Sequence, residues 1–157
     1  MRDSVEVSGG IVGPIGSVRA VEARAAMKLL LDTHIWILAL QRPEKLGRAV
    51  RRQLDSEKNE LYLSPISIWE AHYLVERRRL RIQPGFPEWL DRVFAQAPFE
   101  EALFNFAVAA EASRIVLPHP DPGDLFIAAT ALVFGLTLVT ADPQLLECKW
   151  LNTMSND

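Results

Sequence analysis

The sequence predicts an α/β fold, a three-layer α/β/α sandwich with a central, mainly parallel sheet. Short apolar runs alternate along the chain with longer segments of helical character, as in parallel strands joined by helices. The runs are apolar throughout, which is typical of strands covered on both faces. The first run, three leucines after Lys28, ends abruptly in Asp32, Thr33 and His34. Polar groups therefore stand beyond the carboxyl end of a strand, where such sheets bind their ligands.

The first half of the chain begins with this strand and continues through several helices. The Arg42-Pro43 step ends the first helix, because the residue before proline disfavours helical backbone. Ser64-Pro65 combines an N-cap with proline at the first helical position, and so opens a later helix. The expected elements are a strand at 28–31, helices at 33–40 and 44–58, a strand at 61–63, a helix from 64 to about 79, a turn at 83–87 and a helix at 88–97.

The second half continues the alternation and contains the most apolar helix. Residues 125–134 are apolar nearly all round, which indicates a central helix, and Gly135 ends it. The expected elements are a short strand within 99–104, a helix at 105–115, a rigid loop at 119–124, the helix at 125–134, a strand at 136–139 and a last strand near Trp150.

Residues 1–26 differ from the rest and are interpreted as a mobile N-terminal extension, with the domain at 27–157. Glycine and proline punctuate the segment, no apolar period survives, and the compact apolar core of a secretory signal is missing. Met27 stands directly before the first strand and is a candidate for the true start of the domain.

Deletion of residues 1–26 is expected to leave the melting temperature and the activity nearly unchanged, because the segment lacks a core-forming pattern. Thermal melts and activity assays of the truncated and full chains check this. A large drop in either quantity would show that the segment packs on the domain.

The bulk composition indicates an ordinary soluble globular domain. The 157 residues carry a net charge of −3, so nucleic acid must be held by a local basic patch or through a cation. The longest apolar tract, 125–139, is too short and interrupted to span a bilayer. The single cysteine, Cys148, excludes an internal disulfide and fits a reducing compartment such as the cytoplasm.

Glu70 is the acidic residue for which function is the better explanation. A capping box with Ser67 would account for its spacing, but Pro65 places the helix start at Ser64. Glu70 then falls in the second turn, next to the apolar Trp69. A carboxylate there is costly to desolvate unless it is paired or bound to metal.

The other acids each have a structural explanation when taken singly. Asp32, Asp124 and Asp142 stand where N-caps stand, and Asp121 precedes Pro122-Gly123 in the order of a β-turn. For Asp124 the two explanations are about equal. Together these residues place carboxylates where elements begin on one edge of the sheet. Clustered carboxylates repel one another, and oxygen-only ligation suits Mg²⁺ or Mn²⁺.

Other features carry less weight. The three histidines and Cys148 lack zinc-ligand spacing, and no glycine-rich phosphate loop is present. The densest positive patch follows the helix of Glu70. It either complements the helix dipole or contacts phosphate, and it consists of Arg77, Arg78, Arg79 and Arg81.

Four segments in order resemble the motifs of PIN-domain proteins, and within these the VapC-type toxins of bacterial toxin–antitoxin pairs. The matching segments are 29–34, 63–70, 119–131 and 138–142, and the resemblance covers Met27 to about Leu151. One departure is Leu125, where many relatives carry arginine directly after the acid.

The resemblance implies a metal-dependent endoribonuclease, usually dimeric and inhibited by a cognate antitoxin. It implies hydrolysis of RNA by metal-activated water, with one or two Mg²⁺ or Mn²⁺ ions and no covalent intermediate. By position, the principal acids are Asp32, Glu70 and Asp124, the more variable fourth is Asp142, and the supporting hydroxyls are Thr33 and Thr140.

Two alternatives stay open. Aspartyl-phosphate phosphatases also carry an acid after their first strand, but they usually have a second Asp where this chain has His34. A catalytically inactive PIN module that binds only antitoxin or RNA is the non-enzymatic alternative.

A homodimer is also expected, with one face left for an antitoxin. The reason is an excess of large apolar side chains over what one small domain need bury, namely Trp36, Trp69, Tyr73, Trp89 and Phe94.

Overall fold

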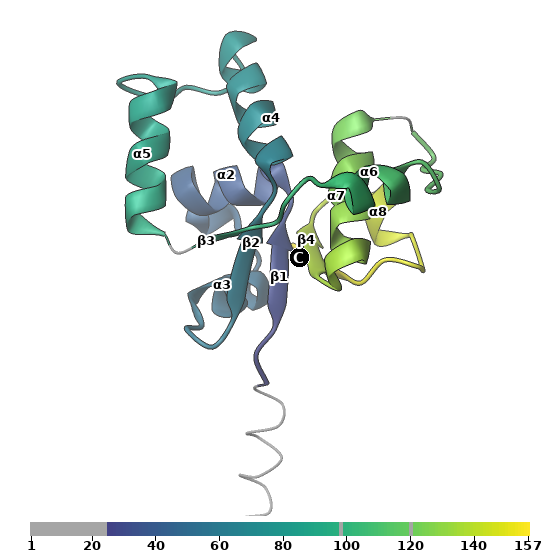
Figure 1. Cartoon of the computed structure of the whole chain (residues 1–157). Helices are drawn as coiled ribbons and strands as arrows, with labels where there is room; N and C mark the ends of the chain where they lie inside the picture. The colour runs from purple at the N-terminus through teal and green to yellow at the C-terminus, as the bar shows by residue number, and fades with distance from the viewer. Residues whose placement is uncertain (1–24, 98, 120) are drawn as a thin grey trace, which may run out of the picture.

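The computed structural model describes residues 25–97, 99–119 and 121–157 (Figure 1). Its five-stranded sheet has the order β3-β2-β1-β4-β5, and every neighbouring pair is parallel. The strands are β1 (Lys28–Leu31), β2 (Glu60–Leu63), β3 (Phe99–Glu101), β4 (Thr137–Thr140) and β5 (Thr153–Ser155). Helices cover both faces of the sheet, which confirms the α/β/α sandwich.

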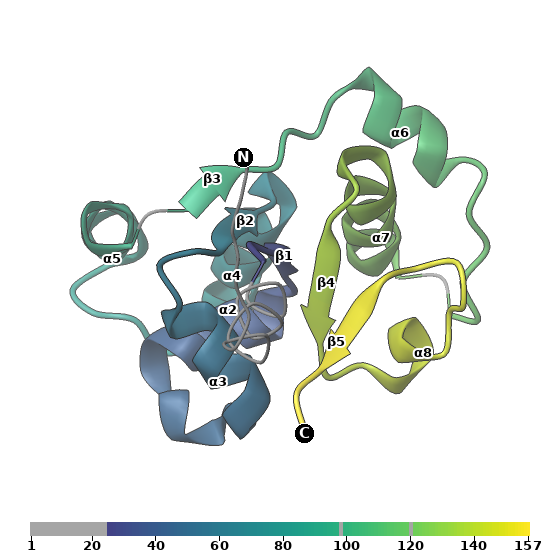
Figure 2. The same cartoon turned by 90° about the horizontal axis from the view of Figure 1, so that it is seen from below.

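The helices form two groups, one on each side of the sheet (Figure 2). One group consists of α2 (Thr33–Gln41), the 3₁₀ turn η1 (Pro43–Lys45), α3 (Arg48–Asp55), α4 (Pro65–Glu76) and α5 (Phe86–Gln96). The other consists of α6 (Phe106–Ala112), α7 (Pro122–Phe134) and α8 (Pro143–Leu146).

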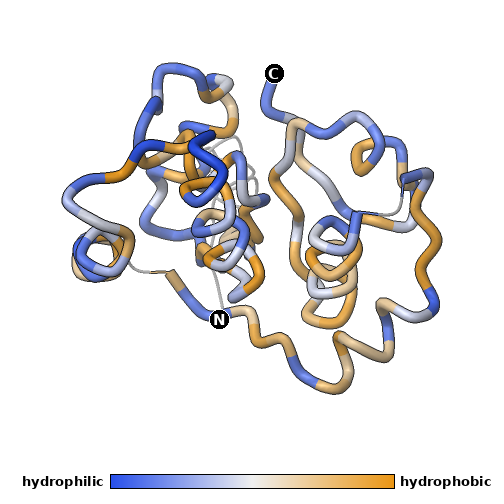
Figure 3. Tube along the Cα trace, turned by 90° about the horizontal axis from the view of Figure 1, so that it is seen from above, coloured by the Kyte–Doolittle hydropathy of each residue, from blue (hydrophilic) through white to orange (hydrophobic). Residues whose placement is uncertain are grey.

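Strand β1 supplies the core to both sides because successive strand residues point to opposite faces. Leu29 and Leu31 pack into the cluster formed with α2, α3, α4 and α5, whereas Leu30 packs against α7 and α8. All three side chains are almost fully buried. Helix α7 is hydrophobic on nearly every side (Figure 3), because the sheet lies on one side of it and α6 on another.

The order of the strands creates a switch point between β1 and β4. From β1 the chain builds outward to β2 and β3 on one side, and then returns to place β4 and β5 on the other. Helices that leave neighbouring strands in opposite directions open a crevice beyond the carboxyl ends, where open α/β sheets bind ligands. Asp32 and Asp142 follow the two strands that flank this point.

Several predicted boundaries were wrong. The predicted helix at 44–58 is split into η1 and α3, because Gly47 is extended and donates its N–H to the Asn156 side chain at 2.7 Å. Helix α4 ends at Glu76 rather than near Arg79, where Arg78 adopts a positive φ of 57°. Helix α5 starts at Phe86, so two of the five residues of the expected turn are helical.

The second half shows shifts of the same kind. Helix α7 begins at Pro122, so the end of the expected loop is its first turn, and α6 is shorter than predicted. The strands β3 and β4 fall near their expected places, and β5 lies beyond Trp150. The short helix α8 was not predicted.

Most of residues 1–26, predicted to be a mobile extension, lie outside the described residues. Two hydrogen bonds hold the backbone of Met27: its N–H donates to Asn59 Oδ1 at 2.9 Å, and its carbonyl accepts from the N–H of Glu60. Within the described ranges, no helix has the length and apolar character that a membrane span requires.

Candidate functional site

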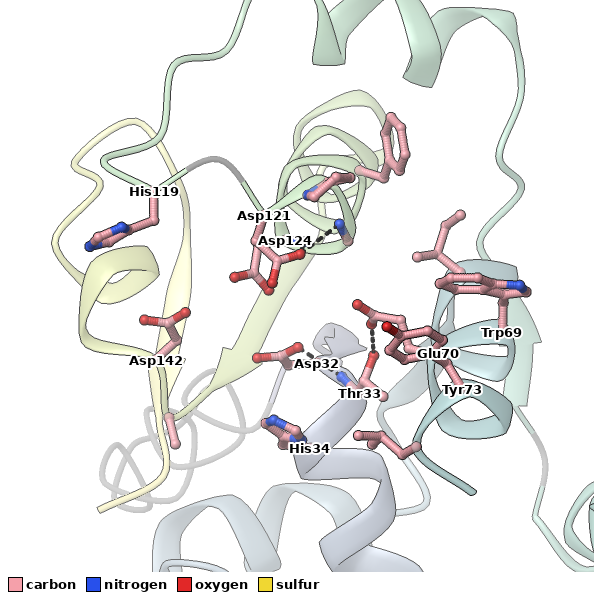
Figure 4. A pocket seen from close by; sticks show the side chains of 16 residues that line it. Asp32, Thr33, His34, Trp69, Glu70, Tyr73, His119, Asp121, Asp124 and Asp142 are labelled. Carbon is pink, nitrogen blue, oxygen red and sulfur yellow. Dashed lines mark hydrogen bonds between the residues drawn. The ribbon is translucent and has the colours of Figure 1, made fainter. Parts of the chain in front are cut away.

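Five acidic side chains line one cavity of about 1140 Å³ beside the switch point (Figure 4). Asp32 follows β1, Glu70 belongs to α4, Asp121 and Asp124 stand at the start of α7, and Asp142 follows β4. The carboxylates surround a common space, although the residues are up to 110 positions apart in sequence. The structure therefore brings together all four acids selected from the sequence, with Asp121 as a fifth.

Asp32 is held by hydrogen bonds on both carboxylate oxygens. Its Oδ1 accepts from the Thr33 N–H at 2.8 Å, and its Oδ2 accepts from the Thr140 hydroxyl at 2.6 Å. The side chain is only 7% exposed. Asp32 thus caps α2, as its position suggested, and also faces the cavity.

Glu70 lies in the second turn of α4, as Pro65 at the helix start required. Its Oε1 accepts from the Thr33 hydroxyl, which is also hydrogen-bonded to the Ser67 hydroxyl at 2.9 Å. Thr33 therefore contacts both acids, Asp32 through its backbone and Glu70 through its side chain.

Asp121, not Asp124, is the N-cap of α7. The Asp121 Oδ1 accepts from the N–H groups of Gly123 at 2.8 Å and Asp124 at 3.3 Å. The capping explanation for Asp124 is therefore wrong. Its half-buried carboxylate has no hydrogen-bond partner among the described residues, and it points into the cavity (Figure 4).

Burial and mutual repulsion raise the pKa values of three of these acids. Burial is the larger cause in each case, because it disfavours the charged form. For Asp32 and Glu70 the pKa is raised, although the hydrogen bonds from Thr140 and Thr33 oppose the rise. Burial followed by the charges of neighbouring acids, Asp121 first, raises the pKa of Asp124 to about 7. A bound cation would relieve this repulsion.

Thr140 connects two sides of the site through one hydroxyl. This group donates to Asp32 and accepts from the N–H of Asp142 at 3.0 Å. Asp142 in turn caps α8 by accepting from the Gln144 N–H at 2.9 Å. The family resemblance implied Thr33 and Thr140 as supporting hydroxyls, and in the structure the Thr33 hydroxyl donates to Glu70 and that of Thr140 to Asp32.

Replacing Thr140 by valine is expected to lower the free energy of unfolding by about 1–3 kcal/mol, because an oxygen of the buried Asp32 loses its partner. Thr140→Ser keeps the hydroxyl and is the matched control. Urea unfolding of the three proteins checks this, and a loss in Thr140→Ser as large as that in Thr140→Val would contradict the assignment of the effect to the hydroxyl.

Residues outside the acid cluster divide into two sets. His34 and His119 line the cavity, whereas His72 packs against Phe86 and Cys148 lies elsewhere. In the described parts of the chain, no three His, Cys, Asp or Glu side chains are arranged so that they could share a metal ion as they stand. The arginines from 77 to 81 do not line the cavity either.

The aromatic wall of the cavity, which Trp69 and Tyr73 form, was not predicted from the sequence. Trp69 and Tyr73 line it from α4, opposite the start of α7, and both side chains are exposed. Their spacing of four residues, which places two side chains on one helical face, was the available signal.

Comparisons with known proteins point in one direction. A family model described as the PIN domain matches residues 29–151. Ribonuclease VapC22 of Mycobacterium tuberculosis is 30% identical over 118 residues, which are 74% of this chain and 88% of that protein. Two structures share the fold at lower identity. VapBC2 from Rickettsia felis bound to promoter DNA is 19% identical with a TM-score of 0.64, covering 83% of this chain and 100% of that one. A toxin–antitoxin complex from Klebsiella pneumoniae is 17% identical with a TM-score of 0.54, covering 82% and 98%.

Proposed function

The chain belongs to the PIN-domain family, and to its VapC-type members, and on that premise we propose that it is a metal-dependent endoribonuclease toxin of a toxin–antitoxin pair. The similar M. tuberculosis protein is named a ribonuclease, which supports RNA as the substrate class. The proposed reaction is hydrolysis of a phosphodiester bond by an activated water that leaves a 5′-phosphate.

The observation that carries this proposal is the convergence of Asp32, Glu70, Asp124 and Asp142 on one cavity. The pKa values of three of the four are raised, first by burial and then by the charges of neighbouring acids, so ionising them together costs free energy that a cation would offset. Proteins that gather carboxylates in this way commonly bind divalent cations through oxygen ligands. The donor set fits Mg²⁺ or Mn²⁺ in chemistry, and a shared ion requires the side chains to draw closer.

Asp32, Glu70 and Asp124 are the residues proposed to hold the cation. When bound, it would supply a Lewis acid that lowers the pKa of water and offsets the charge of the phosphate. Thr33 and Thr140 hold Asp32 in one orientation and favour its ionised form, because hydrogen bonds donated to a carboxylate stabilise its charge. The Thr33 hydroxyl donates to Glu70 and likewise favours its ionised form.

Substrate contact through the basic patch is a further part of the proposal. Arg77, Arg78, Arg79 and Arg81 are exposed around the C-terminus of α4, whose other end carries the acid site. The patch supplies local positive charge on a protein of net charge −3, and phosphates are bound in this way.

The proposal is tested by incubating purified protein with total RNA and Mg²⁺ and sequencing the new RNA ends. New ends carrying 5′-phosphates are expected with the wild type, and none with Asp32→Asn or in EDTA. RNA that stays intact under all three conditions would support the inactive binding module instead.

The aspartyl-phosphate phosphatase alternative is not supported by the family assignment. In that class the acid after the first strand attacks phosphorus, and a nucleophile must be accessible. Asp32 is buried, and both of its oxygens accept hydrogen bonds.

An antitoxin partner and a homodimer are also proposed. The Klebsiella structure is titled a toxin–antitoxin complex, which supports an antitoxin. Two of the side chains on which the dimer expectation rests, Trp36 and Trp89, are buried inside the domain. Trp69 and Tyr73 are exposed but line the acid cavity, whereas Phe94 is exposed outside it and supports an intermolecular contact.

Light scattering of the purified protein is expected to give the mass of two chains, about 35 kDa, at micromolar concentration, twice the 17.6 kDa of one chain. A mass of one chain at every concentration would contradict the dimer.

A further inference from the structure

The cavity is larger than a cation and one phosphate need, and its remaining wall is aromatic. Pockets for whole drug-sized ligands span about 300–1,000 Å³, and this cavity measures about 1140 Å³. Four of the five acids lie toward β1, α7 and α8, whereas Trp69 and Tyr73 lie on α4, on the opposite side, beside the fifth acid, Glu70 (Figure 4). Something beyond the reacting phosphate therefore fits against α4.

Trp69, Tyr73 and Arg77 form a stack of flat groups along α4. The Trp69 and Tyr73 rings are stacked, with centroids 5.4 Å apart and planes at 21°. The Arg77 guanidinium carbon lies 4.7 Å from the Tyr73 ring centroid. The three residues are four positions apart, which places them on one face of the helix. At 1.5 Å per residue, the stack extends about 12 Å away from the acids.

The stack is exposed and does not contribute to the core of the domain. The Trp69 side chain is 62% exposed and that of Tyr73 is 41% exposed. Trp36 and Trp89, in contrast, are buried in the core. Two large rings held in parallel at the mouth of an acidic cavity offer flat apolar surfaces that the fold itself does not use.

We propose that Trp69 and Tyr73 stack on an unpaired base of single-stranded RNA next to the scissile phosphate, with Arg77 at the outer end contacting the backbone. This inference rests on the proposed function, because the acid site defines which phosphate is cut. Aromatic rings that bind bases by their faces, beside basic groups that follow the backbone, are the usual means of holding single strands.

The chemistry of α4 favours a base over a protein partner. The exposed residues of this helix are Trp69, His72, Tyr73 and Glu76, and its two aliphatic residues that line the cavity, Ile66 and Leu74, are only partly exposed. An apolar peptide helix would need aliphatic contacts in such a groove. Beyond Glu76, four arginines provide the charge that a polyanion requires.

The test combines protein variants with altered RNA. Trp69→Leu and Tyr73→Leu remove the rings, Tyr73→Phe keeps the second ring, and Trp150→Leu removes a tryptophan that is 44% exposed outside the cavity. Binding of a labelled single-stranded 12-mer RNA is measured by anisotropy with Mg²⁺, in the Asp124→Asn background so that the RNA stays intact. The same 12-mer with abasic units in place of its bases is measured in parallel. Thermal melts confirm that each variant is folded.

The expected result is a loss of affinity of about 5- to 100-fold for each ring removed, as for other base–aromatic stacks. Tyr73→Phe and Trp150→Leu should bind the 12-mer like the parent protein. The abasic chain should bind the parent and the leucine variants equally. With the Asp124 carboxylate restored, the leucine substitutions should raise KM and leave kcat within about 3-fold.

The proposal is overturned if the leucine variants bind the 12-mer like the parent, or lose as much affinity for the abasic chain. It is also overturned if the leucine substitutions leave RNA binding unchanged and weaken only the binding of a peptide from a co-purified antitoxin. Failure of this inference is distinct from failure of the proposed function. If the protein cuts RNA and the leucine variants have an unchanged KM, the proposed function stands and base stacking on Trp69 and Tyr73 is refuted. If the protein binds bases through the two rings but cuts no RNA, base stacking stands and the proposed nuclease function is refuted.

Discussion

Asp124→Asn is expected to abolish RNA cleavage and at the same time to raise the melting temperature of the metal-free protein at pH 8. Loss of a carboxylate that we propose to hold the catalytic ion should lower kcat/KM by at least about 100-fold. The gain in stability has a separate origin. It arises because the charged form of Asp124 is disfavoured by burial and by neighbouring acids.

The pH dependence of this effect has a definite sign. The pKa of Asp124 is raised from 3.8 to about 7, so between these values the folded protein holds a proton that the unfolded chain has lost. The free energy of unfolding therefore falls as pH rises through this range. Asp124→Asn should remove this fall, on the order of 1–2 kcal/mol after solvent screening is allowed for. Wild type and variant should differ little at pH 4 and most at pH 8.

Asp121→Ala is the matched control, because it removes an acid only three residues away that caps α7 through its Oδ1. Loss of an N-cap costs about 1 kcal/mol. Part of that cost is offset by the lost repulsion with Asp124. Metal response separates the two acids further. Wild type and Asp121→Ala should gain stability from Mn²⁺ through binding linkage, and Asp124→Asn should gain little.

Thermal melts in EDTA and in Mn²⁺, at pH 4 and pH 8, measure all three proteins. An Asp124→Asn protein that melts lower than wild type at pH 8, responds normally to Mn²⁺ and still cuts RNA would show that this acid is structural. Asp32→Asn and Glu70→Gln should lose cleavage in the same way.

Gly123→Ala is expected to lower cleavage by about 10-fold or more while changing the free energy of unfolding by less than about 1 kcal/mol. Gly123 occupies the first turn of α7, where that helix approaches α4. A Cβ there would overlap Glu70 Oε2, the far end of a flexible side chain. Glu70 can move aside at little energetic cost, but it then leaves its bond with Thr33 and its place in the cavity.

Gly85→Ala is the matched control for this prediction. A Cβ at Gly85 would also meet a glutamate oxygen, that of the exposed Glu88, but at the start of α5 and away from the cavity. Gly85→Ala should therefore cut RNA like wild type. Equal activities of the two alanine variants would contradict the placement of Glu70. A large loss of stability in Gly123→Ala alone would show a packing defect instead.

The fold class could be predicted from the sequence because its signals are local. A run such as Leu29-Leu30-Leu31, apolar without alternation, is typical of a strand covered on both faces, and the acid that follows it marks the carboxyl end. Pro65 likewise determined where α4 begins, and therefore that Glu70 lies in its second turn. The short interactions within one turn are encoded in neighbouring residues.

Only the tertiary structure decided which side chains meet. Pro122 at the first helical position makes Asp121 the cap of α7, and the packing of α7 beside α4 places Asp124 in the cavity with Glu70. The break before α3 depends on Asn156, more than 100 residues away in sequence. The pKa values of the acids and the aromatic wall beside them depend on the strand order, which brings β1 next to β4. Spacing along the sequence does not predict these contacts and pKa values, because burial and charge act through space.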